Sequence, residues 1–339
     1  MSKKLLITGA NGQLATEYQL SKPMDGWEFL FLDKKTLDIT VPEQIEEVMG
    51  MWDFNAVLNL AAYTNVDKAE KEETELAFNV NSNGPKNLAV ACNLRNIPLI
   101  HISTDYVFDG EKEGPYTEDD IENPINQYGR TKFLGEKWIQ ENHDWYYIVR
   151  VSWLYSNHSK NFFTTMLTLS QERSEINVIC DQQGSPTSTK EACRAIDRIL
   201  GNLDKSLSGT YHLSGIGKTT WYDFAVEIFN QAKVSISVNP VSSATWSSKV
   251  NRPGRSYMSC EKFSRIFSYH PMHWKNALRE IVSERRIVPV KVGDKVMTDA
   301  GECVVVSTDW LKRKAMIATL DNVEKGMEIS FEILSIKNE

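Results

Sequence analysis

The chain has 339 residues, 41% of them hydrophobic, which is enough for two domains and a small third one. Its net charge is −7 and it has no long basic run, so we expect no nucleic-acid partner. No apolar run is long enough for a membrane-spanning helix or a signal peptide, so we also expect no membrane association. The five scattered cysteines show no Cys-x-x-Cys spacing, which is typical of reduced thiols and predicts a cytoplasmic protein.

Short β-rich runs alternate with helical patterns from residue 3 to about residue 150. The runs are "KLLITG", "EFLFLD", "AVLNLAA", "PLIHIST" and "YYIVRVS". This alternation predicts an α/β fold, a Rossmann-like doubly wound parallel sheet with helices on both faces. Ligands of such sheets bind outside the carboxyl ends of the strands, so the residues that follow each run matter most.

The pattern changes twice after residue 150. Residues 151–286 contain helical segments separated by loops, and predict a smaller lobe that is interleaved with the first domain and returns in part to its sheet. Residues 287–339 carry four strand-like runs, "KVMT", "ECVVVST", "AMIATL" and "EISFEIL", which predict a small β-rich C-terminal module.

A glycine-rich turn follows the first strand. Gly9 and Gly12 allow a tight turn and the close approach of a pyrophosphate to a helix N-terminus, and Ala15 is small enough for the helix to pack on the strand. Ordinary strand-to-helix turns also carry glycines. The position between the first strand and the first helix favours dinucleotide binding, so residues 1–150 are predicted to form a dinucleotide-binding domain.

The residues after the second strand leave the choice of cofactor open. Asp33 ends that strand, and an acidic residue there suits the ribose hydroxyls of NADH. Lys34 and Lys35 follow, and a lysine suits the 2′-phosphate of NADPH.

Tyr128 and Lys132 lie four residues apart in "QYGRTKFLGE" and therefore share one face of a predicted helix. Such a pair is often a plain surface feature. The alternative is acid-base chemistry, in which the ammonium lowers the pKa of the phenol toward neutrality. Thr104 ends the run "PLIHIST" and brings a hydroxyl to the same sheet edge. Together the three groups could serve a ketone that is attacked by hydride, because its oxygen needs a hydrogen-bond donor and a proton.

Nine motifs in order resemble the dTDP-4-dehydrorhamnose reductase family of extended short-chain dehydrogenase/reductases, over about residues 3 to 286. They are "GANGQLA", "LDIT", "LNLAAYTNVDKAE", "HISTDYVFDG", "PINQYGRTKFLGE", "VRVSWLY", "GSPTST", "GTYHLSG" and "NRPGRS". The resemblance implies NADPH- or NADH-dependent reduction of the C4 ketone of dTDP-4-dehydro-L-rhamnose to dTDP-L-rhamnose, for polysaccharide biosynthesis. It also implies that Tyr128 donates the proton, Lys132 lowers its pKa and holds the nicotinamide ribose, and Thr104 bonds the carbonyl.

The resemblance implies further contacts. The nucleotide-sugar substrate would be bound by Thr104, Asp105, Trp153, Arg252 and Arg255, although a lone tryptophan more often packs in a core and the two arginines equally suit a solvated surface. The cofactor would be held, besides Tyr128 and Lys132, by Gly9, Asn11, Gly12, Gln13, Leu14, Asp33, Asp38, Ile39, Ala62, Tyr63, Thr64 and Ile102.

Some members of this family bind magnesium through glutamates at a dimer contact. Glu17 falls at a matching position, but Lys190 stands where a second acid would be expected, and a lysine repels a divalent cation. We therefore expect no tight metal site by this route. A homodimer stays open.

Two other functions compete with the reductase. In dehydratases of this superfamily an Asp-Glu pair follows the threonine, whereas here Tyr106 follows Asp105, so the sequence disfavours elimination by a dehydratase. Another nucleotide-sugar reductase or an epimerase of the same superfamily stays an alternative. A non-catalytic NAD(P)-binding regulatory subunit would have no need to keep Thr104, Tyr128 and Lys132 together.

Overall fold

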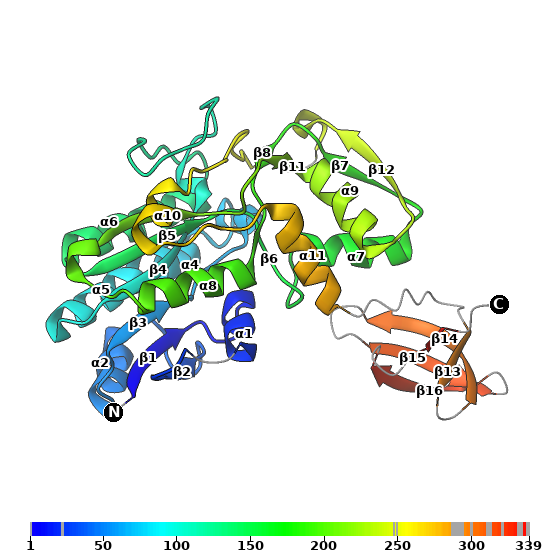
Figure 1. The fold of residues 1–339 in the computed structure, drawn as a ribbon, viewed down its shortest axis with the longest axis horizontal. Helices are drawn as coiled ribbons and strands as arrows, with labels where there is room; N and C mark the ends of the chain where they lie inside the picture. Colours follow the sequence, from blue (N-terminus) through cyan, green and yellow to red (C-terminus); the bar gives the residue numbers. More distant parts are fainter. Residues whose placement is uncertain are drawn as a thin grey trace.

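The protein is described here from a computed structural model. The structure describes residues 2–21, 24–246, 248 and 250–285, and beyond these the strand segments 295–298, 301–309, 314–319, 322–330 and 335–336. Figure 1 shows a larger lobe around the central sheet and a smaller lobe around α7 (Phe162–Glu172), α9 (Trp221–Ala232) and α11 (Trp274–Glu284). The C-terminal strands lie beyond the end of helix α11.

A six-stranded parallel sheet forms the centre of the larger lobe. Its order is β10-β5-β4-β3-β1-β2, which confirms the predicted doubly wound fold. The order reverses between the neighbours β1 and β3, and the crevice at such a switch point is where these sheets bind ligands. The six strands are β1 (Lys3–Thr8), β2 (Trp27–Leu32), β3 (Ala56–Asn59), β4 (Leu99–Thr104), β5 (Tyr146–Val151) and β10 (Gly209–Leu213).

Both faces of this sheet are buried, as β1 illustrates. Leu5 and Ile7 belong to one hydrophobic core and Leu6 to the other, because successive side chains of a strand point to opposite faces. Helices α1 (Gln13–Leu20) and α8 (Thr189–Leu200) cover the first face. The second face is covered by α2 (Pro42–Met51), α5 (Gly84–Arg95) and α6 (Gln127–Asn142).

The smaller lobe has a third core, built by α7 (Phe162–Glu172), α9 (Trp221–Ala232) and α11. The side chain of Asn161 caps α7, and that of Thr220 caps α9, so both helices begin where polar residues satisfy free backbone N–H groups. The two-stranded parallel pair β7 (Glu175–Ile179) and β12 (Ser237–Val241) packs on this core.

Segments from beyond residue 150 return to the large sheet: β10 and α8 pack in its first core, together with residues of α10 (Glu261–Phe267). The remaining helices and short strands form connections. They are α3 (Val66–Ala69), α4 (Thr74–Phe78), β6 (Leu154–Tyr155), β8 (Gln183–Gly184), β9 (Thr187–Ser188), β11 (Thr219–Thr220), a π-helical turn (Asn79–Asn83) and, among the described residues, three 3₁₀ turns (Asp105–Val107, Lys205–Leu207 and Ser243–Thr245).

The C-terminal strands form an antiparallel sheet in the order β16-β15-β14-β13-β17. Strands fall at each predicted run, but β16 begins several residues before "EISFEIL", whose last residues lie outside the described ones, and β17 was not expected. The bounds are β13 (Lys295–Thr298), β14 (Gly301–Asp309), β15 (Lys314–Thr319), β16 (Asn322–Ser330) and β17 (Ser335–Ile336).

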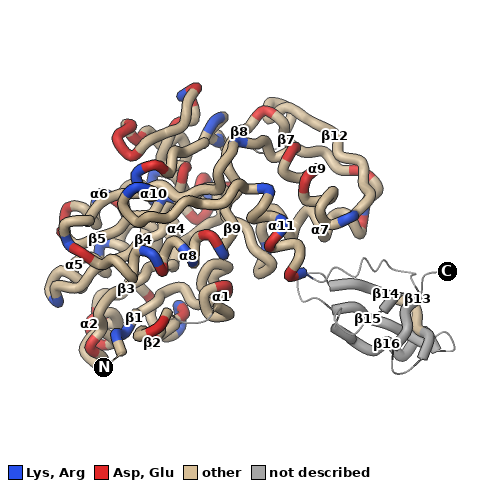
Figure 2. Tube along the Cα trace, viewed as in Figure 1, with Lys and Arg blue, Asp and Glu red and all other residues tan. Residues whose placement is uncertain are grey.

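Charged residues of both signs alternate along the described chain. Figure 2 shows Lys and Arg interspersed with Asp and Glu over both lobes. Among the described residues, no helix combines the length and the apolar character that crossing a bilayer requires.

Candidate active site

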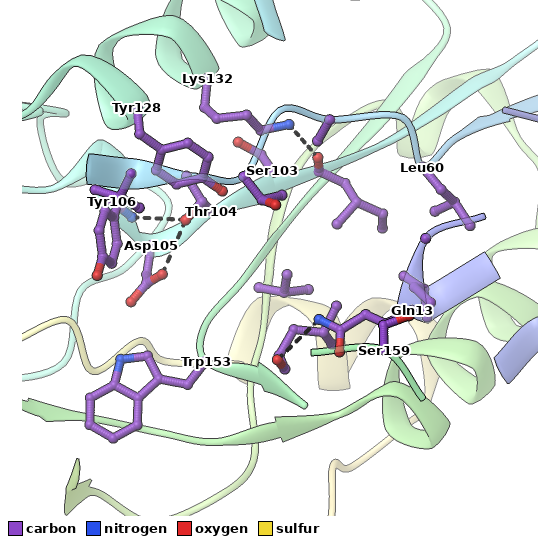
Figure 3. A pocket seen from close by; sticks show the side chains of 18 of the residues that line it. Gln13, Leu60, Ser103, Thr104, Asp105, Tyr106, Tyr128, Lys132, Trp153 and Ser159 are labelled. Carbon is purple, nitrogen blue, oxygen red and sulfur yellow. Dashed lines mark hydrogen bonds between the residues drawn. The ribbon is translucent and has the colours of Figure 1, made fainter. Parts of the chain in front are cut away.

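A pocket of about 450 Å³ opens at the carboxyl edge of the sheet. It is lined by the glycine-rich turn after β1, by the end of β4, by the first turns of α6 and by the smaller lobe. Figure 3 shows Tyr128 and Lys132 projecting from α6 on one side, with Trp153 and Gln13 across from them. The size is within the usual range for a small-molecule site.

The backbone of the glycine-rich turn packs closely against the residues that follow β3. Gly9 has φ +69°, and a Cβ there would come within 2.6 Å of the backbone nitrogen of Ala61. Gly12 is the N-cap of α1 and has no side chain to cap the helix. The free N–H groups of the first turn of α1 therefore face the pocket, as phosphate binding requires.

A second pocket of about 300 Å³ adjoins the first and shares Asn11, Gly12, Leu60 and Ala62 with it. The two pockets together accommodate an elongated ligand that runs along the glycine-rich turn. Every residue that the resemblance assigns to the cofactor lines at least one of them. Gly9, Asp33, Asp38, Ile39 and Tyr63 line the second, Gln13, Leu14, Thr64, Ile102, Tyr128 and Lys132 the first, and Asn11, Gly12 and Ala62 both.

Asp33 and Lys34 both line the second pocket. The Asp33 carboxylate is held by the hydroxyl and backbone N–H of Thr36, which lower its pKa, and it accepts a hydrogen bond from the Asn11 amide at 3.1 Å. Lys34 lies 3.7 Å from Asp38 and is largely exposed. Asp33 and Lys34 therefore both lie where the adenosine ribose of the cofactor is expected, and their positions favour neither NADH nor NADPH.

Tyr128, Thr104 and Asp105 face one small space (Figure 3). The Tyr128 hydroxyl lies near the Thr104 side chain, which offsets part of the rise that burial causes in the phenol's pKa, and the Tyr128 ring contacts the edge of Tyr106 with ring centroids 5.6 Å apart. Thr104 Oγ1 also lies 3.2 Å from Asp105 Oδ1. Asp105 is fully buried, its Oδ2 has no hydrogen-bond partner, and burial raises its pKa to about 7.

Helix α6 is anchored so that its first turn faces β4. The Asn126 side chain caps it by accepting from Gly129 N–H at 2.8 Å, and donates to the carbonyl of Asn251 in the smaller lobe at 2.9 Å. One turn further on, Lys132 Nζ donates to the carbonyl of Ile102 at 2.7 Å. The four-residue spacing of Tyr128 and Lys132 on α6 therefore places both side chains in the first pocket.

One expectation about this pair is wrong in the structure. Burial raises the pKa of Tyr128 to about 12, and the hydrogen bond with Thr104 offsets only part of that rise. Lys132 does not lower it, because its Nζ is bonded to Ile102 and lies beside His101 instead. Burial also lowers the pKa of Lys132 itself to about 8. Removal from water disfavours the charged form of each group and sets the direction of both shifts.

Trp153 lines the pocket from the smaller lobe, with φ +46°. Its indole is stacked on that of Trp221 at a centroid distance of 3.5 Å, and a Cβ on Gly184 would come within 2.5 Å of the ring. One face is therefore covered by protein, so Trp153 packs in the lobe and lines the pocket at once.

The two arginines predicted to grip the substrate diphosphate line neither pocket. Arg252 donates to Asp67 on α3 at 2.8 Å and is hydrogen-bonded to Tyr106, which does line the first pocket. Arg252 therefore stands at the pocket's rim. Arg255 is exposed, and its backbone N–H bonds the carbonyl of Gly110.

The surroundings of Glu17 do not suit a magnesium ion. Its carboxylate accepts from the Thr189 hydroxyl at 2.9 Å and lies 3.8 Å from Lys190 Nζ and 3.5 Å from His158 Nε2. Lys190 is also paired with Glu284. Two basic side chains thus occupy the directions in which a divalent cation would need further acidic ligands.

The pocket includes residues that the motifs did not single out. Trp221 opens α9, and Ser159 and Lys160 belong to the loop before α7; all three approach from the smaller lobe. Ser156 Oγ and Asn161 Nδ2 of the same loop lie 3.3 Å from Gln13 Oε1, which joins that lobe to the glycine-rich turn. Nothing in the local sequence pattern marks a loop residue as a partner of a turn more than 140 residues away.

The chain matches the model of the RmlD substrate binding domain over residues 3–287. It is 36% identical to the dTDP-4-dehydrorhamnose reductase of Sinorhizobium fredii, covering 82% of this chain and 96% of the relative. It is 35% identical to the spore coat polysaccharide biosynthesis protein SpsK of Bacillus subtilis, covering 83% and 98%. The crystal structure of a dTDP-4-dehydrorhamnose reductase from Bacillus anthracis in complex with NADP superposes with a TM-score of 0.80 at 38% identity, covering 84% of this chain and all of that one. The chain therefore belongs to the RmlD family, the family of the dTDP-4-dehydrorhamnose reductases.

Proposed function

We propose that this protein reduces the C4 ketone of dTDP-4-dehydro-L-rhamnose to dTDP-L-rhamnose, with NADPH or NADH as the reductant. The observation that carries the proposal is the convergence of Tyr128, Thr104 and Lys132 on one pocket beside a glycine-rich phosphate cradle. Membership of the reductase family supports it, because relatives across nearly their whole length bear that name.

The residues present fit a nicotinamide dinucleotide. The glycine-rich turn would hold the pyrophosphate, the second pocket with Asp33 and Lys34 the adenosine ribose, and Lys132 the nicotinamide ribose. When bound, the reduced nicotinamide supplies the hydride that the ketone carbon accepts.

Tyr128 is the proton donor in this proposal. As the ketone carbon gains hydride, its oxygen takes up the electron pair of the carbonyl double bond, and the Tyr128 hydroxyl delivers a proton to that oxygen. A phenol with a pKa of about 12 stays protonated at neutral pH, and it is still a stronger acid than the secondary alcohol that forms. The high pKa therefore suits a reductase, whose acid must be protonated when the substrate arrives.

Thr104 and Asp105 orient the sugar. The Thr104 hydroxyl lies beside Tyr128 in the pocket and can donate to the same ketone oxygen, which stabilises the developing charge. The unpartnered Oδ2 of Asp105 offers a hydrogen bond to a neighbouring sugar hydroxyl, which would also remove the cost of leaving that oxygen buried and unsatisfied. Trp153 supplies an apolar wall.

We propose a matching division of the chain. Residues 1–150 bind the cofactor, residues 151–286 bind the nucleotide sugar through Trp153 and Arg252, and residues 287–339 form a separate β module. The reaction would take place in the cytoplasm, and the free thiols of Cys92, Cys180, Cys193 and Cys260 are consistent with that reducing compartment.

An elimination reaction finds less support in this site. The residue after Asp105 is Tyr106, whose ring packs on Tyr128 and whose hydroxyl is bonded to Arg252. It leaves the site without the second carboxylate that a dehydratase uses.

The proposal is tested by incubating the protein with dTDP-4-dehydro-L-rhamnose and either NADPH or NADH, and following loss of the reduced cofactor. Mass spectrometry and sugar analysis should identify dTDP-L-rhamnose as the product. A panel of other 4-keto sugar nucleotides defines the selectivity. Tight cofactor binding without turnover of any ketone in the panel would refute the reductase and favour a regulatory subunit.

A further inference from the structure

A chain of four buried polar side chains runs beneath the pocket, from strand to strand and into α6. Thr8 ends β1, Asn59 ends β3, His101 lies in β4 and Lys132 lies on α6. The first three have no exposed surface and Lys132 is 2% exposed. Of the four, only Lys132 lines the pocket, so the other three reach the site only through it.

The orientation of the Asn59 amide is fixed by a backbone donor. Ala61 N–H can only donate, and it lies 3.2 Å from Asn59 Oδ1 and farther, at 3.4 Å, from Thr8 Oγ1. Asn59 Oδ1 also accepts from the Thr8 hydroxyl at 2.7 Å. The atom that faces both must therefore be oxygen. The other end of the amide is then the NH₂ group, and it must donate to the His101 Nδ1 atom 2.9 Å away.

This donation selects the tautomer of His101. Nδ1 accepts, so it carries no hydrogen. Burial holds the pKa of His101 well below its usual value, so the ring is neutral and its single N–H is at Nε2. That nitrogen lies 3.2 Å from Lys132 Nζ.

We propose that His101 donates its Nε2–H to the Lys132 amine, and that Asn59, oriented by Ala61 N–H, and His101 are a positioning network that sets the protonation state of Lys132, with Thr8 at its outer end. A neutral amine completes this network, because it accepts from His101 and donates to the carbonyl of Ile102 at 2.7 Å. An ammonium has donors only, so a protonated Lys132 would meet a second donor at His101.

The other charged or titratable groups around Lys132 act less directly. Glu136, one turn along α6, favours the ammonium, but its carboxylate is bonded to buried Arg150 and to the Ser103 hydroxyl. Tyr128 and Asp105 share the pocket with Lys132, and burial favours the neutral form of each. Burial lowers the pKa of Lys132 to about 8, and a donor facing its amine acts in the same direction.

This inference rests on the proposed function for its effect on rate. If the ammonium form of Lys132 assists Tyr128, turnover falls as the pH rises through the Lys132 pKa, and the network places that fall near neutrality rather than near the usual value for lysine. Asn59→Asp reverses the network: a carboxylate accepts from His101, moves its hydrogen to Nδ1, and turns Nε2 into an acceptor for the ammonium. The alkaline fall in turnover should then move up by at least about one pH unit.

Thr8→Val is the matched control. It removes the outermost hydroxyl but leaves Ala61 N–H to orient the Asn59 amide, so the alkaline limb should stay where it is in the wild type. Lys132→Met should lack the limb. If Asn59→Asp leaves the limb unmoved while Thr8→Val shifts it, the network does not act through the His101 tautomer.

The direct test needs no substrate. ¹⁵N-histidine-labelled protein is examined by long-range ¹H–¹⁵N correlation NMR at neutral pH, and the His101 signals are assigned by their absence in His101→Gln. The network predicts hydrogen at Nε2 and a bare Nδ1 in the wild type and in Thr8→Val, and hydrogen at Nδ1 in Asn59→Asp. Hydrogen at Nδ1 in the wild type, or at both nitrogens, would overturn the proposal. The wild-type result decides even if Asn59→Asp does not fold, and it stands whether or not the protein reduces the proposed ketone.

Discussion

Gly129 lies so close to Tyr106 that no side chain fits between them: a Cβ on Gly129 would come within 2.2 Å of the Tyr106 carbonyl oxygen. This contact sets the distance between the first turn of α6 and the turn that follows β4. Tyr128 lies directly before Gly129, and Thr104 lies two residues before Tyr106, at the start of the 3₁₀ turn Asp105–Val107. The approach of the phenol to the threonine hydroxyl therefore depends on the absence of a methyl group.

Gly129→Ala should push α6 away from Tyr106 and separate Tyr128 from Thr104. We expect the free energy of unfolding to fall by about 1 to 3 kcal/mol and turnover to fall by roughly tenfold or more. Chemical denaturation and steady-state kinetics measure the two effects. Gly50→Ala, at an exposed position of α2, is the control. No side chain or neighbouring segment lies within 4 Å of its added Cβ, so it should leave turnover unchanged. Equal turnover in both variants would mean that the close contact does not position the acid.

Tyr128→Phe removes the proton donor and little else. Turnover should fall by roughly 100-fold or more, while the affinity for NADPH, measured by fluorescence titration, should change little. Tyr155→Phe is a suitable comparison, because the Tyr155 hydroxyl is buried without a hydrogen-bond partner and lies outside the pocket. Turnover of the Tyr128→Phe variant at the rate of Tyr155→Phe would reject the assignment of the acid.

Asp33 and Lys34 should set the preference between the two cofactors in opposite directions. Asp33→Asn keeps an acceptor for Thr36 but removes the charge that repels a 2′-phosphate, so the ratio of kcat/KM for NADPH over NADH should rise about tenfold. Lys34→Gln should lower that ratio by a smaller factor, roughly threefold, because the lysine is 69% exposed and screened by solvent. A change in the same direction for both variants would show that neither faces the phosphate.

Asp105 should make the protein less stable as the pH rises. Burial raises its pKa from 3.8 to about 7, so the folded state binds the proton more tightly than the unfolded state does. Its contribution to stability is fully present below about pH 4 and is lost as the pH rises through about 7. Comparing pH 5 with pH 8, the wild type should lose about 3 kcal/mol more than Asp105→Asn in urea denaturation. Parallel pH dependence of the two proteins would show that the Asp105 carboxyl is solvated.

The sheet was predictable because each of its first five strands is an apolar run that ends in a small or polar residue. Leu5, Leu6 and Ile7 are apolar in succession, which only a strand buried on both faces allows. The catalytic group was predictable for a related reason: carboxyl ends of parallel strands meet at one edge, so Thr104 and the glycine-rich turn had to share it.

The remaining features depend on three-dimensional contacts that no local pattern records. Trp221 reaches the pocket through its stacking on Trp153, 68 residues earlier. The buried side chains linked to Lys132, which are Thr8, Asn59 and His101, come from three different strands. The pKa of Tyr128 was predicted in the wrong direction because the spacing of two residues gives their mutual attraction but not their loss of solvent.

The central claim is that hydride passes to the ketone carbon of the sugar in this pocket. The measurement that tests it most directly uses NADPH deuterated at both positions of nicotinamide C4, with dTDP-4-dehydro-L-rhamnose as substrate and NMR of the purified product. We predict dTDP-L-rhamnose with one deuterium at sugar C4, formed at a rate that Tyr128→Phe reduces by about 100-fold. Product without deuterium at C4, or no product from protein that binds NADPH tightly, would contradict the account.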